Sequence, residues 1–135
     1  MAVGSRRRAR ERALGLLYEA LAKDLEPAQV MSELPVEPDD YASDIVAGVA
    51  RMLPEIDSIL GRNAIDWTVD RMPVIDRTLL RMATYELLAR PDVPTGVVIS
   101  EAVELAKQYS TEESGRFVNG ILAAIAAATR PQPSD

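Results

Sequence analysis

The sequence contains no cysteine and no histidine. Disulfides, thiol nucleophiles and imidazole acid–base chemistry are therefore excluded, as are zinc sites built from the usual ligands. Neither a GxxxxGK[ST] nor a GxGxxG phosphate-binding loop occurs. Carboxylates are plentiful, but no spacing singles out two of them as an acid–base pair. We therefore expect no enzymatic activity, no cofactor and no metal.

Aromatic residues and long apolar runs are also scarce. Aromatics make up 4% of a chain that is 47% hydrophobic, and a core of Ala, Leu, Val and Ile favours packing of helix on helix. The longest weakly polar run, residues 120–128, is far shorter than the ~20 apolar residues of a membrane span. Near the N-terminus, Glu19 and Lys23 interrupt any signal-peptide core. We expect a soluble, cytoplasmic, all-α protein whose 135 residues form one domain.

Positive charge is concentrated at one end of the chain. Residues 1–12 contain five arginines and one glutamate, a net charge of +4, whereas the whole chain carries −6, which leaves −10 on the remainder. An acidic body repels nucleic acid everywhere except at such a basic arm. The segment RRRAR at residues 6–10 is a short arginine-rich motif of the kind that binds RNA phosphates. A solvated basic terminus explains the motif equally well.

Apolar residues recur at helical spacing along most of the chain. About six to seven helices are expected, at 6–22, 27–34, about 40–63 and 74–88, then one with an apolar stripe over 98–109 and a last one with a stripe over 117–125. Pro27 can open the second helix, and Asp39 or Asp40 can cap the third. Pro54 lies inside the third, where we expect a kink or a restart.

Two signals concern the last helix. Ser110 and Glu113 match a capping box that would open it. Asn119-Gly120 normally indicates a turn, but the apolar period continues through the pair without a phase change, so we expect an unbroken helix. Gly120 is then expected to let another helix approach closely.

The arginines of the first helix lie outside its apolar stripe, so we expect that their replacement by alanine leaves the fold intact. Positive charge at a helix N-terminus opposes the helix dipole, at a cost of up to about 1 kcal/mol. This end can therefore stay frayed until a polyanion binds. Among the aromatic residues, Tyr18 is expected at the core edge and Trp67 as a plug over the core. Phe117, beside Arg116, fits base stacking and core packing equally well.

Three segments, in the same order, resemble the NusB family over nearly the whole chain. They are RRRARERALGLLYEA near the N-terminus, WTVDRMPVIDRTLLRMATYELL in the centre and DVPTGVVISEAVELAKQYSTEESGRFVNGIL towards the C-terminus. Ser100 stands where the family commonly has Asn, and Pro54 interrupts a helix often free of proline. The resemblance implies two packed three-helix subdomains, about 1–66 and 67–130, and a polar tail at 131–135.

The same resemblance implies a function. A NusB-like chain is expected to be a transcription antitermination factor that binds boxA RNA of ribosomal RNA leader transcripts together with NusE, a small-subunit ribosomal protein. The complex is expected to load onto elongating RNA polymerase with other Nus factors. By likeness, the RNA contacts are Arg6, Arg7, Arg8, Arg10, Glu113, Arg116 and Phe117. The NusE contacts are Tyr18 and Asp76.

Two other functions stay open at this point. The RNA-binding domain that some RNA cytosine methyltransferases carry ahead of their catalytic part also resembles NusB. Because the chain ends at Asp135 with no room for a catalytic domain, that alternative requires a fragment. The other alternative is a protein-only helical adaptor whose arginines merely solubilise a terminus. The sequence also leaves open whether the free protein is a monomer or a homodimer that hides its basic arm.

Overall fold

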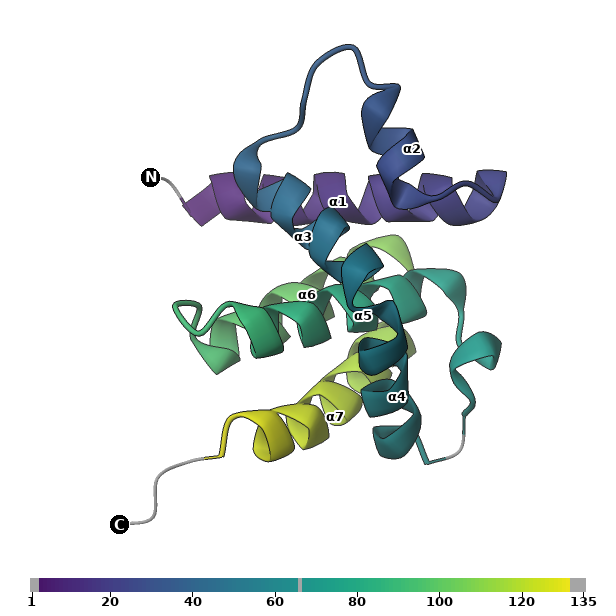
Figure 1. Cartoon of the computed structure of the whole chain (residues 1–135). Helices are drawn as coiled ribbons and strands as arrows, with labels where there is room; N and C mark the ends of the chain where they lie inside the picture. The colour runs from purple at the N-terminus through teal and green to yellow at the C-terminus, as the bar shows by residue number, and fades with distance from the viewer. Residues whose placement is uncertain (1–2, 66, 132–135) are drawn as a thin grey trace.

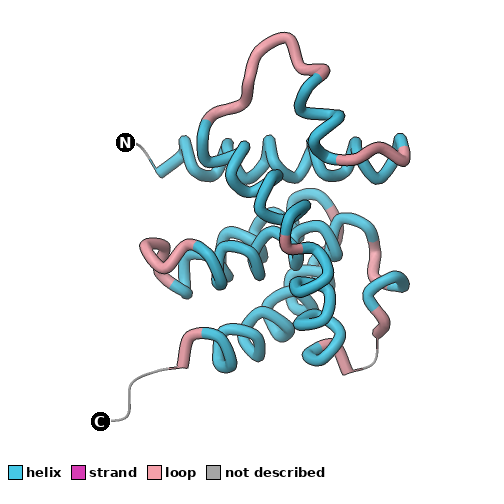
Figure 2. The backbone as a smooth tube through the Cα atoms, in the orientation of Figure 1, coloured by secondary structure: helices cyan, strands magenta, loops and turns pink. Residues whose placement is uncertain are grey.

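Seven α-helices and one 3₁₀ turn form the fold over residues 3–65 and 67–131, the part of the chain that this computed structural model describes (Figure 1). The helices are α1 (Val3–Lys23), α2 (Pro27–Ser32), α3 (Asp40–Arg51), α4 (Leu53–Asn63), α5 (Val74–Ala89), α6 (Thr95–Tyr109) and α7 (Glu112–Thr129), and the 3₁₀ turn η1 is Val69–Arg71. No strand occurs in these ranges (Figure 2). The all-α prediction is therefore confirmed. Residues 132–135 of the predicted tail lie outside the described residues.

Local sequence signals set several helix boundaries. Pro27 is the first residue of α2, as predicted, although this helix ends at Ser32. Asp39 caps α3 by accepting a hydrogen bond from the backbone amide of Ala42 at 2.8 Å. The chain restarts as α4 with Pro54 in its first turn, where the missing N–H of proline costs no helical hydrogen bond. The predicted restart at Pro54 is thus confirmed.

The start of α7 differs from the predicted capping box. Its N-cap is Thr111, whose hydroxyl accepts a hydrogen bond from the Ser114 amide at 3.0 Å. The hydroxyl of Ser110 instead lies 2.9 Å from that of Ser114. The prediction was wrong by one residue because Ser and Thr are both good N-caps, and the sequence alone does not choose between adjacent ones.

α7 continues through Asn119-Gly120, as predicted. The expected role of Gly120 in a close helix approach is wrong, because a Cβ atom built there would have no neighbour within 4 Å. The close approach occurs at Gly48 instead. A Cβ atom at this position of α3 would overlap the ring of Tyr85 from α5. The hydroxyl of Tyr85 donates to Asp44 at 2.8 Å, which holds the ring in place over Gly48.

The helices pack around α5. α1, α2 and α3 pack against one another, and α5, α6 and α7 form a second group, which α4 joins through α5 and α7. Figure 1 shows α1 and α2 on one side of α5 and α7 on the other. α5 contacts members of both groups, and Leu79 and Leu80 at its centre are completely buried. No described helix is long and apolar enough to cross a membrane. A division of the chain near residue 66 into separate subdomains stays a prediction.

Replacing Gly48 by alanine should lower the free energy of unfolding by about 1–3 kcal/mol, because the added methyl group has to displace the Tyr85 ring. Gly61→Ala in α4 is the matched control, since a Cβ there meets nothing within 4 Å. The control should stabilise the protein by up to about 1 kcal/mol through helix propensity. Urea denaturation followed by circular dichroism measures both. Equal stability of the two variants would contradict the close approach.

Candidate functional site

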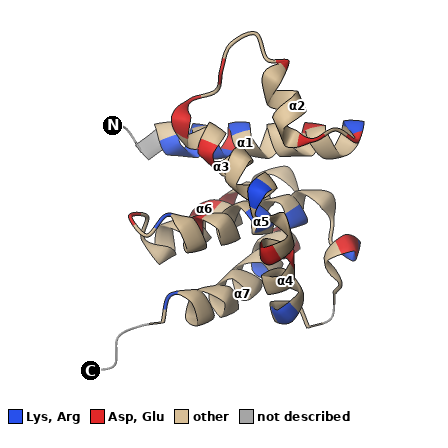
Figure 3. Ribbon diagram, viewed as in Figure 1, with Lys and Arg blue, Asp and Glu red and all other residues tan. Residues whose placement is uncertain are grey.

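The basic end of α1 is docked against the rest of the protein. Positively charged residues in its first turns lie beside the acidic start of α3 (Figure 3). Within the described residues the chain is helical from Val3, so the arginines of this end all lie on α1. Ion pairs with Glu86 of α5, Glu101 of α6 and Asp92 of the connection between them offset the unfavourable interaction of the arginines with the helix dipole.

Arg10 is buried, with 4% of its surface exposed. Its Nε and Nη2 donate to the two carboxylate oxygens of Glu86 at 2.8 Å each, a bidentate charge-assisted pair. Glu86, itself buried, also accepts from the Tyr41 hydroxyl at 2.6 Å. Burial, together with this hydrogen bond, raises the pKa of Tyr41 to about 12. The expectation that all the arginines lie outside the core is therefore wrong for Arg10.

Arg7 pairs with a carboxylate but keeps an exposed edge. Its Nε and Nη2 donate to the oxygens of Glu101 at 3.1 and 2.6 Å. The Arg7 side chain is 51% exposed, whereas that of Glu101 is 10% exposed. The hydrogen bond from Arg7 lowers the pKa of Glu101 in spite of its burial. Glu101 therefore orients the guanidinium of Arg7, and the remaining N–H groups of Arg7 can donate to a phosphate.

Among the other arginines of α1, Arg6 lies against Tyr41, and Arg8 and Arg12 are exposed. The guanidinium carbon of Arg6 lies 4.6 Å from the centre of the Tyr41 ring, and Arg90 approaches the same ring at 4.6 Å. Arg6 is also 3.6 Å from Asp92. Arg8 and Arg12, one turn apart, are both exposed. α1 therefore presents a basic edge formed by Arg7, Arg8 and Arg12.

A pocket of about 370 Å³ lies where the starts of α5 and α7 meet the connection after α4. We call it the Trp67 pocket; its lining includes Trp67, Pro73, Asp76, Thr111, Glu113 and Phe117. The Trp67 and Phe117 rings meet edge to face with their centres 6.1 Å apart. Trp67 forms one wall of this pocket. Because 46% of its surface is exposed, the prediction that Trp67 covers the core as a plug is wrong. Phe117 is partly buried and packs against the core while it also lines the pocket.

The polar part of the Trp67 pocket contains Asp76, which is 2% exposed. One carboxylate oxygen accepts from the Ser114 hydroxyl at 2.9 Å, and the other has no hydrogen-bond partner among the described residues. Glu113 and Arg116, on the first turns of α7, are exposed. Of the predicted site residues, Asp76, Glu113 and Phe117 line this one pocket. Arg116 is the neighbour of Phe117 in the chain. The arginines of α1 are not among the lining residues.

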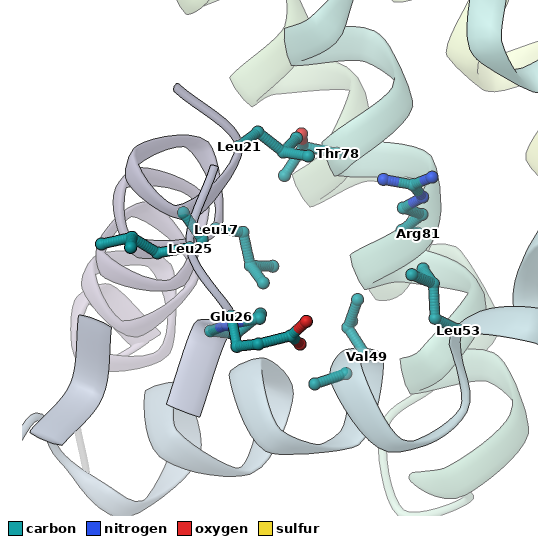
Figure 4. A pocket seen from close by; sticks show the side chains of 11 residues that line it. Leu17, Leu21, Leu25, Glu26, Val49, Leu53, Thr78 and Arg81 are labelled. Carbon is teal, nitrogen blue, oxygen red and sulfur yellow. The ribbon is translucent and has the colours of Figure 1, made fainter. Parts of the chain in front are cut away.

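Tyr18 lies in another part of the surface. It is half exposed, as is Leu21 one turn later on α1. Leu21 lines an apolar pocket of about 210 Å³ between α1, α3 and α5, with Leu17, Leu25, Val49 and Leu53 (Figure 4). We call it the Leu21 pocket. Tyr18 and Asp76, the two predicted NusE contacts, therefore do not line the same pocket.

Comparison with known proteins decides the family, because the NusB family model matches residues 7–127. This chain belongs to the NusB family. A transcription antitermination protein NusB of Kineococcus radiotolerans is 44% identical over 128 residues, which are 92% of this chain and 94% of that protein. Another, from Salinispora arenicola, is 47% identical over 129 residues, 90% and 95% of the two chains. The role of the NusB family is transcription antitermination, which is not an enzymatic activity.

Solved NusB structures have the same fold. The structure of T. maritima NusB matches with a TM-score of 0.80 at 40% identity and covers 90% of this chain and 89% of that one. A structure of antitermination factors NusB and NusE in complex with dsRNA matches with a TM-score of 0.80 at 30% identity, covering 94% and 99% of the two chains.

The acidic partners of the arginines were not predicted, although the apolar pattern of the sequence contains a signal for them. Glu86 lies four residues after Met82 and seven after Leu79, so it occupies the apolar stripe of α5. Glu101, between Val98 and Ala102, occupies the stripe of α6 in the same way. A charged residue on a stripe that must be buried needs a partner. Arg10, three residues before Ala13 on α1, is that partner for Glu86, and Arg7 is the partner of Glu101, with Arg10 forming a further ion pair at 3.6 Å.

Arg10→Ala should lower the free energy of unfolding by about 3–5 kcal/mol, because it leaves the Glu86 carboxylate buried with one partner fewer. Arg12→Ala removes the same charge from the exposed face of α1 and should change stability by no more than about 0.5 kcal/mol. Chemical denaturation at neutral pH measures the difference. Two variants of equal stability would show that the buried pair does not hold α1 in place.

Proposed function

We propose that this chain acts in transcription antitermination by binding boxA RNA of ribosomal RNA leader transcripts together with NusE. The complex then loads onto elongating RNA polymerase with other Nus factors, in the cytoplasm. Membership of the NusB family over residues 7–127 carries this proposal. It is supported by the likeness to a NusB that was solved with NusE and RNA, over 94% of this chain.

The RNA surface consists of the basic edge of α1 and the Trp67 pocket. Arg7 and Arg8 are exposed, and the chain beyond residue 12 carries a net charge of −10, so phosphates are attracted to this edge more than to the rest of the surface. Arg6, which stays partly exposed beside Tyr41, can add a contact. Arg10 supports RNA binding by fixing α1, because its guanidinium is enclosed by carboxylates.

NusE binds at the Leu21 pocket and the adjoining side chain of Tyr18. Half-exposed apolar and aromatic side chains around a preformed hollow are typical of protein interfaces. A basic ribosomal protein also suits the charge of −10 that the chain carries beyond its basic arm. Asp76 is buried beneath Ser114, so we assign it to shaping the Trp67 pocket instead of a direct NusE contact.

RNA and NusE then occupy separate surfaces of the protein. The bound NusE can extend the RNA surface, so that both proteins hold the RNA more tightly than either does alone. Such coupling suits a linear RNA, which offers phosphates and exposed bases but no folded structure that a protein could recognise.

The double variant Arg7→Ala/Arg8→Ala should bind single-stranded boxA RNA more weakly. The slope of log affinity against log salt should flatten by about 0.7 for each phosphate contact that is lost. Lys23→Ala/Arg62→Ala is the matched control, because it removes two exposed positive charges far along the chain. Fluorescence anisotropy with labelled RNA gives both quantities. If variant and control share the salt slope of the parent, the basic edge does not contact RNA.

Tyr18→Ala/Leu21→Ala should weaken NusE binding by about tenfold or more, since centrally placed aromatic and apolar side chains carry much of the affinity of an interface. The control, Val36→Ala/Ile65→Ala, truncates two apolar residues that are even more exposed. Calorimetry with purified NusE measures both, and RNA binding without NusE should be unchanged. A NusE affinity equal to that of the parent would place the interface elsewhere.

A further inference from the structure

A groove of about 750 Å³ lies between α2 and α3. We call it the α2–α3 groove. Its walls are largely apolar and are formed by Ala28 and Met31 of α2 and by Val46, Ala47 and Ala50 of α3. The groove meets the Leu21 pocket at Pro27 and Ala50, which line both. Tyr18 and Leu21, the residues assigned to NusE, do not line the groove.

The α2–α3 groove has the length of a short helix. Asp40 and Arg51 are the first and last residues of α3, and both line the groove. The 12 residues of α3 span about 18 Å, so a partner helix of about three turns fits beside them. The small side chains of Ala28, Ala47 and Ala50 leave room for larger apolar side chains of a partner. Apolar grooves of this kind bind amphipathic helices that insert residues at i, i+3, i+4 and i+7.

The part of the chain that builds this groove is acidic. Residues 24–50 contain seven Asp and Glu residues and no Lys or Arg. Figure 3 shows acidic residues along the connection from α2 to α3 and at the start of α3. Glu37 and Asp40 line this end of the groove and are exposed. None of the ion pairs among the described residues involves either of them. Arg51 lines the opposite end of the groove.

Apolar walls beside exposed carboxylates determine the kind of partner that fits. The carboxylates repel the phosphates of RNA, so the groove is not a further nucleic-acid site. Val36, next to Glu37 in the chain, is 75% exposed and adds an apolar side chain to this region. A helix with one apolar face and flanking Lys or Arg side chains would cover the apolar walls and also pair with the carboxylates.

We propose that the α2–α3 groove is a docking site for a basic amphipathic helix of a protein other than NusE. The apolar face of this helix lies in the groove, and its Lys or Arg side chains lie beside Glu37 and Asp40. The inference goes beyond the proposed function and does not depend on it. A helix in the groove leaves the basic edge of α1, Tyr18 and Leu21 uncovered, so this partner can bind the same molecule as RNA and NusE.

A designed peptide is the direct probe of the groove. It consists of leucine, alanine and lysine, forms about three helical turns and has its leucines at i, i+3, i+4 and i+7. The fluorescence anisotropy of the labelled peptide should rise to saturation at one peptide per molecule of the full-length protein. A scrambled peptide of the same composition has no apolar face and should bind about tenfold more weakly or worse. Equal affinity for the two peptides would reduce binding to unspecific charge attraction and overturn the proposal.

Ala47→Gln tests the apolar wall of the groove. A glutamine side chain at this exposed position of α3 fills the groove and should weaken peptide binding about tenfold or more. Ala124→Gln is the matched control, because it adds the same side chain to an exposed position of α7, and it should bind the peptide like the parent. Circular dichroism checks that both variants are folded. Equal peptide affinities of the two variants would place the binding site outside the groove.

Glu37→Gln/Asp40→Asn tests the charges and keeps the apolar walls intact. Loss of two exposed ion pairs with the peptide should weaken binding about 2- to 10-fold at low salt, and the difference should shrink at high salt. Glu55→Gln/Asp70→Asn is the matched control, because both residues are exposed and Glu55, like Asp40, lies in the first turn of a helix. A peptide affinity of the first variant equal to that of the control would overturn the preference for a basic partner.

Further measurements decide which molecule occupies the groove. Saturating NusE should leave the peptide bound, and displacement would assign the groove to NusE and overturn a separate partner. A protein that sediments as a dimer by itself, and as a monomer after Ala47→Gln, would show that a second copy of the chain fills the groove and would overturn the proposal as well. Binding of RNA and of NusE by Ala47→Gln should equal that of the parent, so a groove that binds no peptide leaves the proposed function intact.

Discussion

The charge pair between Arg10 and Glu86 lies in the interior of the protein and joins the first helix to the central one through two hydrogen bonds of 2.8 Å. Removing both charges from water is costly, so the pair defines how α1 is placed more than it adds to net stability. Tyr41 completes the arrangement by donating to the same carboxylate and by accepting Arg6 and Arg90 against its ring. These contacts determine which side of α1 faces the interior of the protein and which side faces solvent.

This orientation of α1 decides what the arginine-rich motif can do. With Arg10 directed inward, Arg7 reaches Glu101 and Arg8 faces solvent. Several charges of the motif are already neutralised by carboxylates, so the motif attracts RNA less strongly than its +4 suggests. Phosphate attraction at the remaining edge is also independent of base sequence. Under the proposed function, discrimination among RNA sequences has to come from another part of the surface, and the Trp67 pocket is the part that we assign to RNA beside this edge.

The same placement leaves room for a protein partner. The Leu21 pocket is built from the C-terminal half of α1 together with α3 and α5, whereas the Trp67 pocket is built from the starts of α5 and α7 (Figures 1 and 4). α5 contributes to both because it packs against α1 and α3 of one group and against α6 and α7 of the other. A partner on one pocket and RNA on the other can therefore be bound together.

The sequence by itself determined the all-α class, most helix positions, the restart at Pro54 and the family, because periodicity, proline geometry and motif order are local properties of the chain. It also identified Phe117 and Glu113, which do meet at one pocket. Only the tertiary structure decided that Arg10 is internal while Arg8 is exposed, and that Trp67 is a pocket wall. The partners of these residues, Glu86 for Arg10 and Phe117 for Trp67, are 76 and 50 positions away in the chain. The spacing of residues within one helix carries no information about which side chain of another helix it will meet.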